Sequence, residues 1–407
     1  MTRPICFFLI AASALAADSK HWVATWGASP APQYATEEQI RKAKLFFENQ
    51  TLREIVHVSL GGDSVRVRLS NAYGKQSIEI GAAQIALRGN GAGIAAGSSH
   101  ALTFSGRSSI SIPPDAVVIS DPVSVNLPPA SDLAISLFLP KATPAGGIHY
   151  SSQQTSYYGP GDLTSASTIS EAQTIKSWVF LTGVDVLAPQ SAATLVAFGD
   201  SITDGARSTL DANHRWPDIL ASRLQHAHKK IGVVDAGIGG NRILHDAGAA
   251  IPGFGMNALA RFDRDVIAVP GVKYVIILEG INDLGHAGSS APESETVSAE
   301  DLIAGMRQLI ERAHEKGIKI YGGAITPFEG TVSKGYFTPE KEAKRKAINE
   351  WIRTSHSFDG VVDFEKAIRD PEHPDRMLAT YDGGDHLHPG DAGYKAMGEA
   401  VDLALFK

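Results

Sequence analysis

Beyond about residue 190, the sequence alternates short apolar runs with segments of helical periodicity. Strands that are apolar throughout are typical of parallel sheets buried on both faces. Ser298 and Thr338 stand where helix N-caps are expected, and Pro339 follows the second of them. The alternation predicts an α/β fold, a parallel sheet covered by helices. The predicted strands cover 194–198, 231–236, 272–278, 318–324 and 361–364, and the predicted helices cover 216–226, 299–315 and 339–355.

The sequence before this region has a different pattern. Residues 64–70 alternate polar and apolar side chains, and Gly- and Pro-rich turns separate similar runs at 78–80, 123–127, 133–139 and 178–186. Short strands with turn-rich connections predict a β-sandwich or jelly-roll-like domain. A chain of 407 residues is long for one domain. With a junction at 187–191, we expect a β-rich accessory domain over 18–190 and an α/β domain over 191–407.

Residues 1–17 have the pattern of a secretory signal peptide. Arg3 is positively charged, residues 5–15 are mostly apolar, and Ala14-Leu15-Ala16 fits a small-residue cleavage site. An apolar N-terminal strand or helix is the alternative. Cleavage would remove Cys6, the only cysteine, so we expect neither a disulfide nor thiol chemistry in the mature protein. The pattern predicts a secreted or periplasmic protein.

Charge and hydropathy exclude two kinds of partner. The formal net charge is -7 and the sequence has no Lys/Arg cluster, which argues against binding to nucleic acid. The N-terminal apolar stretch is too short to span a membrane, and no second long apolar run follows it. We expect no membrane span, and the sequence leaves the oligomeric state open.

Polar residues follow three of the predicted strands. Gly199 and Asp200 separate Ser201 from the first predicted strand. The Ser201 hydroxyl becomes a nucleophile only when a base removes its proton. His388 is the favoured base, and Asp385 is placed to fix the tautomer of its imidazole. The alternative is that Ser201 is a turn or capping serine. We expect these side chains to meet beyond the carboxyl ends of the strands.

His386 is a rival to His388. In an extended segment the two side chains would point the same way, so a metal pair is conceivable. No third histidine or carboxylate stands at a familiar ligand spacing, and there is no His-Glu-x-x-His sequence. We therefore expect neither a metal nor a cofactor.

If a serine attacks a carbonyl group, the tetrahedral intermediate needs hydrogen-bond donors for its developing oxyanion. The backbone N–H of Ser201, a backbone N–H at Gly240 and the side chain of Asn282 are the candidates for an oxyanion hole. The alternatives are a flexible glycine turn and an Asx turn at Asn282. A dinucleotide-binding loop is disfavoured, because Arg242 stands where the third glycine of Gly-x-Gly-x-x-Gly is needed.

The short sequences around Ser201, Gly240, Asn282 and His388 resemble those of the GDSL or SGNH hydrolases. The resemblance extends from about Thr194 to the C-terminus. The resemblance implies a flavodoxin-like three-layer α/β/α sandwich with a mainly parallel five-stranded sheet. It implies that Ser201 is the nucleophile, that His388 and Asp385 complete the catalytic residues, and that Ser201, Gly240 and Asn282 form the oxyanion hole. The first fragment reads Gly-Asp-Ser-Ile instead of Gly-Asp-Ser-Leu.

The stretch from Arg242 to Asp283 is similar to a narrower subgroup of secreted esterases found near xylan-degrading genes. That similarity implies short acyl groups, such as acetyl, on a small-molecule or polysaccharide ester. Residues 243–257 form either a wall over the site or a surface loop. The alternatives in function are a lipid acylhydrolase or arylesterase, and a catalytically inactive carbohydrate-binding protein. Aromatic side chains that could stack on sugars, or could fill the core, are Trp22, Trp26, Tyr150, Tyr157, Tyr158 and Trp178.

Overall fold

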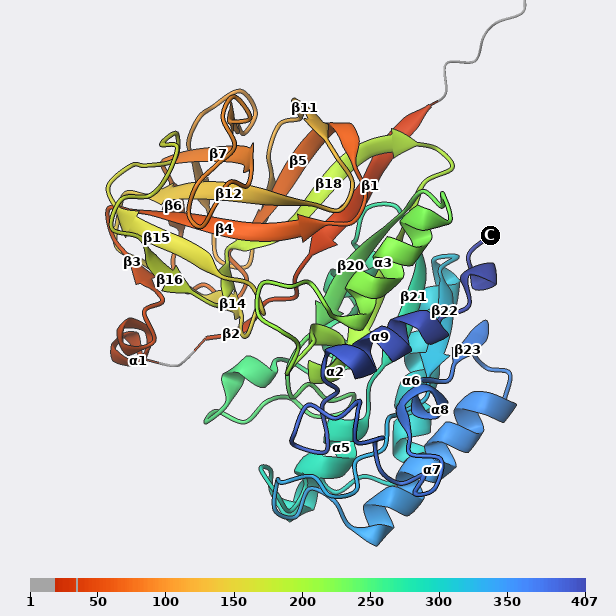
Figure 1. Ribbon diagram of the computed structural model, residues 1–407. Helices are drawn as coiled ribbons and strands as arrows, with labels where there is room; N and C mark the ends of the chain where they lie inside the picture. The colour runs from red at the N-terminus through yellow and green to blue at the C-terminus, as the bar shows by residue number, and fades with distance from the viewer. Residues whose placement is uncertain (1–18, 34–35) are drawn as a thin grey trace, which may run out of the picture.

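The computed structural model describes residues 19–33 and 36–407. The predicted signal peptide lies outside these residues. Figure 1 shows a β-rich N-terminal region beside a region in which helices surround a second sheet. No helix in the described part of the chain is both long and apolar enough to cross a membrane.

The C-terminal region is built on a parallel sheet with strand order β20-β19-β21-β22-β23. The predicted sheet is therefore confirmed, and each strand lies within two residues of its predicted bounds. The strands are β19 (Ala193–Gly199), β20 (Ile231–Gly237), β21 (Val272–Leu278), β22 (Lys319–Gly323) and β23 (Gly360–Val362).

Two helical layers cover this sheet. From β19 the chain moves to β20 at one edge of the sheet, whereas from β21 onward it moves toward the other edge. Because crossovers between parallel strands are right-handed, the helices of these two sets of connections lie on opposite faces of the sheet. Helix α3 packs on α9, and α6 packs on α7. Ser298 and Thr338 cap α6 and α7 as predicted. The helices are α2 (Ser201–Asp204), α3 (Trp216–His226), α4 (Ala258–Phe262), α5 (Ile281–His286), α6 (Ala299–Glu315), α7 (Pro339–Thr354), α8 (Phe364–Ile368) and α9 (Asp391–Ala400).

The N-terminal region contains two larger antiparallel sheets that share one apolar core. Its strand content agrees with the predicted β-rich region, while the sandwich topology stays a prediction. One sheet contains β1 (Lys20–Gly27), β5 (Gly62–Ser70), β10 (Val117–Ile119), β11 (Val123–Leu127) and β18 (Leu181–Pro189). The other contains β4 (Gln50–Val58), β7 (Ala82–Leu87), β8 (His100–Ala101), β12 (Ser131–Leu139), β15 (Ser156–Pro160) and β16 (Gln173–Ile175).

Small sheets of two or three short strands and a helix complete this region. The strand predicted over 178–186 is divided into two at Phe180. The left-handed φ of 67° at this residue interrupts the extended backbone between the two strands. The remaining elements are α1 (Glu37–Lys42), β2 (Ala31–Pro32), β3 (Phe46–Phe47), β6 (Ile78–Ile80), β9 (Ile110–Ile112), β13 (Thr143–Pro144), β14 (Gly147–His149) and β17 (Trp178–Val179).

The two regions are joined along strand β1. The predicted junction at 187–191 overlaps the end of β18, which continues to Pro189 and pairs with β1. The Ala24 N–H donates to Thr194 Oγ1 (3.0 Å), and the Ser59 hydroxyl accepts from the N–H of Val233 (2.8 Å) on β20. Strand β20 is an edge of the parallel sheet, and the N-terminal region covers that edge.

The contact between β1 and β20 requires a residue without a side chain at position 232. A Cβ atom on Gly232 would lie 2.1 Å from the backbone oxygen of Ala24. We expect Gly232→Val to lower the free energy of unfolding by about 3 kcal/mol, because a backbone atom cannot move aside as a side chain can. Urea denaturation measures this change. Gly248→Val, where a Cβ would have no neighbour within 4 Å, is the matched control, and equal losses in both variants would contradict the prediction.

Candidate active site

The fold gathers the candidate site at the carboxyl ends of β19, β20 and β21. Strand β19 lies between β20 and β21, which follow it in sequence on opposite sides. This is the topological switch point, where parallel α/β sheets form their binding crevices. Ser201, Gly240 and Asn282 follow these three strands directly.

Ser201 is the first residue of α2. Asp200 caps this helix, since its Oδ1 accepts from the N–H of Ile202 at 2.9 Å. The half-buried Ser201 places its Oγ 2.8 Å from Nε2 of His388. The structure thus brings together a hydroxyl and an imidazole that are 187 residues apart in sequence.

Asp385 orients the His388 ring. Its Oδ2 lies 2.9 Å from Nδ1 of His388, and its Oδ1 accepts from the backbone N–H groups of Leu387 (3.1 Å) and His388 (2.9 Å). Because the carboxylate accepts from Nδ1–H, Nε2 is the free acceptor that faces the serine hydroxyl. Burial alone raises the pKa of Asp385, but the hydrogen bonds from His388 and Leu387 outweigh it and lower that pKa well below its usual range.

Arg207 is a further partner of this carboxylate that the sequence did not single out. Its Nε donates to Asp385 Oδ2 at 3.0 Å, while its side chain stays 55% exposed. Such an exposed ion pair stabilises weakly. Arg207 therefore helps to orient the carboxylate from the rim of the site.

The two histidines of the predicted pair have different surroundings. His386 has a left-handed φ of 57°, so the segment is not extended and its ring pairs with Asp382. The side chain of His386 is 54% exposed, whereas that of His388 is 17% exposed and faces Ser201. In the described residues, no group of three or more His, Cys, Asp or Glu residues is arranged to hold a metal ion.

The three candidate oxyanion donors are linked through the turn after β20. A Cβ on Gly239 would lie 3.9 Å from Cβ of Ser201, which places this turn beside the serine. Asn282 donates one Nδ2 hydrogen to the backbone oxygen of Asn241 at 2.9 Å, immediately after Gly240. Among the described residues, the backbone N–H groups of Ser201 and Gly240 have no hydrogen-bond acceptor. They and the second hydrogen on Asn282 Nδ2 are free to bind an oxyanion.

Two residues that the sequence did not reveal hold the Asn282 amide. Its Oδ1 accepts from the Tyr336 hydroxyl at 2.7 Å and lies 2.9 Å from Nε2 of His286. The other nitrogen of His286, Nδ1, lies 2.8 Å from the Ser290 hydroxyl. These contacts settle which end of the amide is oxygen, so Nδ2 points away from Tyr336. His286 follows Asn282 by four residues on α5, but Tyr336 is 54 residues away and carries no local signal.

Asp283 has a structural role. Its carboxylate accepts from the N–H groups of Ile243 (2.8 Å) and Leu244 (3.0 Å), which fixes the chain after the glycine turn. Burial raises its pKa to about 6, although the two backbone hydrogen bonds oppose that rise. Asp283 is 1% exposed. It therefore supports the turn that carries Gly240.

The segment 243–257 forms a wall beside the site. Gly240 has a left-handed φ of 78°, and a Cβ there would lie 2.3 Å from the Phe254 ring, so only glycine allows this ring to cover the turn. Phe254 also contacts the His286 ring at 5.2 Å between centroids. Residues 251–254 line a cavity of about 210 Å³. Of the two alternatives for this segment, the structure favours the wall.

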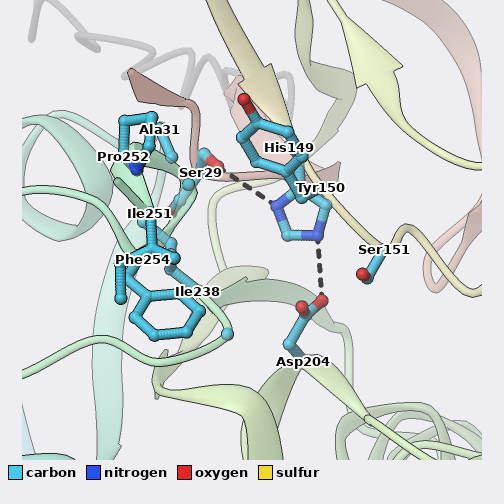
Figure 2. Close-up of a pocket in the computed structure, with 12 residues that line it drawn as sticks. Ser29, Ala31, His149, Tyr150, Ser151, Asp204, Ile238, Ile251, Pro252 and Phe254 are labelled. Carbon is cyan, nitrogen blue, oxygen red and sulfur yellow. Dashed lines mark hydrogen bonds and ion pairs between the residues drawn. The ribbon is translucent and has the colours of Figure 1, made fainter. Parts of the chain in front are cut away.

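That cavity lies between the two regions of the molecule (Figure 2). Of the aromatic residues that could bind sugar, Tyr150 lines it, whereas Trp26, Tyr158 and Trp178 are buried in the N-terminal core. Trp22 packs instead against the Arg66 guanidinium, 4.2 Å from the ring centroid.

Residues 197–396 match the GDSL-like Lipase/Acylhydrolase family, and this range contains Ser201, Gly240, Asn282, Asp385 and His388. This part of the chain is a GDSL-like lipase/acylhydrolase domain with the parallel sheet of that fold. The protein is a carboxylic ester hydrolase.

Solved structures of similar proteins cover about half of this chain. No curated protein sequence matches the chain. A protein assigned to the G-D-S-L lipolytic family of Desulfitobacterium hafniense is 24% identical, with a TM-score of 0.38, over 51% of this chain and 97% of that one. The aryl esterase of M. smegmatis is 17% identical, with a TM-score of 0.41, over 51% of this chain and 96% of that one. A GDSL-like lipase of Bacteroides thetaiotaomicron is 18% identical, with a TM-score of 0.36, over 52% and 87% of the two chains.

The burial of His286 has a consequence for stability. Burial first, and then the positive charges of Arg242 and Lys341, lower the pKa of His286 to about 4. An unfolded histidine titrates near ~6.5, so between these values the unfolded chain binds a proton that the folded chain does not. This histidine therefore makes a contribution to stability that decreases as the pH falls from 6.5 toward 4.

We expect the difference in unfolding free energy between wild type and His286→Gln to change by about 3 kcal/mol between pH 7 and pH 4, in favour of the variant at low pH. Urea denaturation at several pH values measures it. Because both proteins share all other titrating groups, the comparison isolates this ring. A difference that does not change with pH would contradict the assignment.

Proposed function

We propose that this protein hydrolyses esters through an acyl-enzyme on Ser201. His388 accepts the hydroxyl proton as Ser201 Oγ attacks the ester carbonyl, and the same proton then passes to the departing alcohol. Water, deprotonated by His388, attacks the acyl-enzyme and releases the acid together with the free serine. The observation that carries this proposal is the line of contacts from Ser201 Oγ to His388 (2.8 Å) and from His388 to Asp385 (2.9 Å).

The oxyanion of each tetrahedral intermediate binds to the N–H groups of Ser201 and Gly240 and to Nδ2 of Asn282. All three donors are fixed by the fold before substrate arrives, so little reorganisation is needed when the negative charge develops. Tyr336 and His286 act through Asn282 and are positioning residues. Burial raises the pKa of Tyr336 well above 10, so its hydroxyl remains a donor to Asn282 at neutral pH.

The proposed substrates are short acyl esters, acetyl esters above all, of carbohydrates. The sequence similarity to secreted esterases found near xylan-degrading genes supports this substrate class.

We also propose the division into a β-rich accessory domain over 18–190 and a catalytic domain over 191–407. Two separate apolar cores support it, one mostly within each region. Export to the periplasm or the medium is a further proposal, which the amino-acid pattern of residues 1–17 supports. Mass spectrometry of the protein recovered from an expressing culture would locate the cleavage site.

Substitution of the proposed catalytic residues tests the mechanism. We expect Ser201→Ala and His388→Ala each to reduce kcat for 4-nitrophenyl acetate by about 10³-fold or more. His386→Ala is the matched control, and we expect less than a threefold change because this ring pairs with Asp382 at the surface. Near-wild-type activity in Ser201→Ala, with its folding verified by circular dichroism, would overturn the proposal.

Removal of the Tyr336 hydroxyl tests the support of the oxyanion hole. We expect Tyr336→Phe to lower kcat by about tenfold with little change in KM, because Asn282 loses one of the donors that hold its amide in place. Tyr158→Phe is the matched control, since this hydroxyl donates to Gln173 in the N-terminal region. A change confined to KM in Tyr336→Phe would contradict the positioning role.

A panel of esters separates the possible substrate classes. The panel contains acetylated xylan, other acetylated sugars, feruloyl esters, aryl esters from acetate to palmitate, and phospholipids. We expect the highest kcat/KM for acetylated sugars and a steep decline with acyl length. A preference for palmitate or phospholipid would favour a lipid acylhydrolase. Binding of sugars without hydrolysis of any ester would favour an inactive carbohydrate-binding protein.

A further inference from the structure

The cavity drawn in Figure 2 is lined by residues that are close to Ser201. Asp204, which lines it, is the last residue of the helix that Ser201 begins. Gly239, another lining residue, is close to both, since a Cβ there would lie 3.9 Å from Ser201 Cβ and 4.0 Å from Asp204 Oδ2. The cavity therefore adjoins the helix that carries Ser201.

A buried ion pair lines this cavity. His149 and Asp204 are 5% and 4% exposed, and Nε2 of His149 lies 2.9 Å from Asp204 Oδ1. Nδ1 of the same ring lies 3.1 Å from the backbone oxygen of Ser29. A carbonyl and a carboxylate can only accept, so both ring nitrogens donate and the imidazole is protonated. Burial lowers the pKa of His149, but the charge of Asp204 outweighs burial and raises it.

Burial of such a pair between two regions of a protein contributes little to the free energy of folding. Two charges removed from water lose their hydration, and an apolar pair of similar size is often as stable or more stable. The pair also joins the two regions of the chain, since His149 ends strand β14 and Asp204 ends helix α2. We therefore consider which ligand groups could bind to the polar atoms of this pair.

One oxygen of the Asp204 carboxylate is available to bind a ligand. Oδ1 is bonded to His149, and among the described residues Oδ2 has no hydrogen-bond partner although Asp204 lines the cavity. The hydroxyls of Ser29 and Ser151 line the same space and likewise have no partner in the described part of the chain. Figure 2 shows Asp204 and Ser151 near His149, and Ser29 across from that ring, beside Ala31.

The other side of the cavity is apolar. Ile238, Pro252 and Phe254 form it. The Tyr150 ring, which also lines the cavity, packs on Gly253, where a Cβ would lie 2.7 Å from it. An acyl chain in this space would cover a carboxylate oxygen without offering it a donor, which is costly. A sugar ring offers apolar C–H groups to one side and hydroxyl donors to the other, and hydrogen bonds to a carboxylate are among the strong ones.

We propose that this cavity binds the sugar ring of the substrate, with ring hydroxyls donating to Asp204 Oδ2 and the ring face against Phe254. His149 holds Asp204 in place, so the N-terminal region supplies a residue that determines substrate specificity. This proposal rests on the proposed hydrolysis of carbohydrate esters.

The test is the ratio of kcat/KM for an acetylated methyl glycoside to that for 4-nitrophenyl acetate, which has no sugar. In Asp204→Asn we expect the ratio to fall at least tenfold, mainly through KM for the glycoside, because an amide nitrogen replaces an acceptor. Asp132→Asn is the matched control: it alters another His–Asp pair, His57 and Asp132 (2.7 Å), within the N-terminal sheets. We expect the wild-type ratio in that control.

The outcomes separate the two proposals. A wild-type enzyme that cleaves no acetylated glycoside refutes the carbohydrate substrate itself. A wild-type enzyme that cleaves them, with an unchanged ratio in Asp204→Asn, refutes the sugar-binding cavity alone.

A second measurement does not depend on the folding of the variant. An unacetylated methyl glycoside should inhibit wild-type hydrolysis of 4-nitrophenyl acetate competitively. Absent or noncompetitive inhibition at concentrations up to the KM of the acetylated glycoside would overturn the proposed cavity.

Discussion

The active-site end of the sheet depends on the buried guanidinium of Arg261. It donates to the backbone oxygens of Gly199 and Ala236 at 2.8 Å each, at the ends of β19 and β20, and to Asn241 Oδ1 at 2.7 Å. Asp265, 3.2 Å away, balances its charge, and Glu279 is a further partner at the same distance. Because five hydrogen-bonding directions are fixed in one plane, this side chain sets the relative positions of two strand ends and the glycine turn. Ser201 and Gly240 lie next to those points.

The charge around Arg261 explains why the site tolerates so many carboxylates. Burial raises the pKa of Asp200 to about 7 and also raises that of Glu279, while the cation of Arg261 opposes both shifts. Removal of the guanidinium would leave buried acids without compensation, which is far more costly than the loss of a surface ion pair. One side chain on a short helix thus supports both the geometry and the electrostatics of the strand ends.

Sequence patterns predict the parallel sheet well, because its strands are buried on both faces and read as uninterrupted apolar runs. The sequence does not predict strand β4, because the charged residues Arg53 and Glu54 at its centre interrupt the apolar pattern. Both side chains are nevertheless fully buried. Arg53 is satisfied by the Ser136 hydroxyl and by backbone oxygens such as that of Ala92, partners that no local pattern reveals. In the same way, Ser201 and His388 could be proposed from strand ends and motifs, whereas Tyr336, His149 and Arg261 act across long sequence separations.

The pairing of β1 with β18 has a consequence for biosynthesis. Lys20 faces Pro189 in this pair, so the first described strand has no partner until most of the N-terminal region has left the ribosome. Non-local strand pairing of this kind slows folding and leaves apolar surface open to wrong contacts in the meantime. Because β1 also lies against β20, the nascent chain gains its final architecture only after the hydrolase region has begun to emerge.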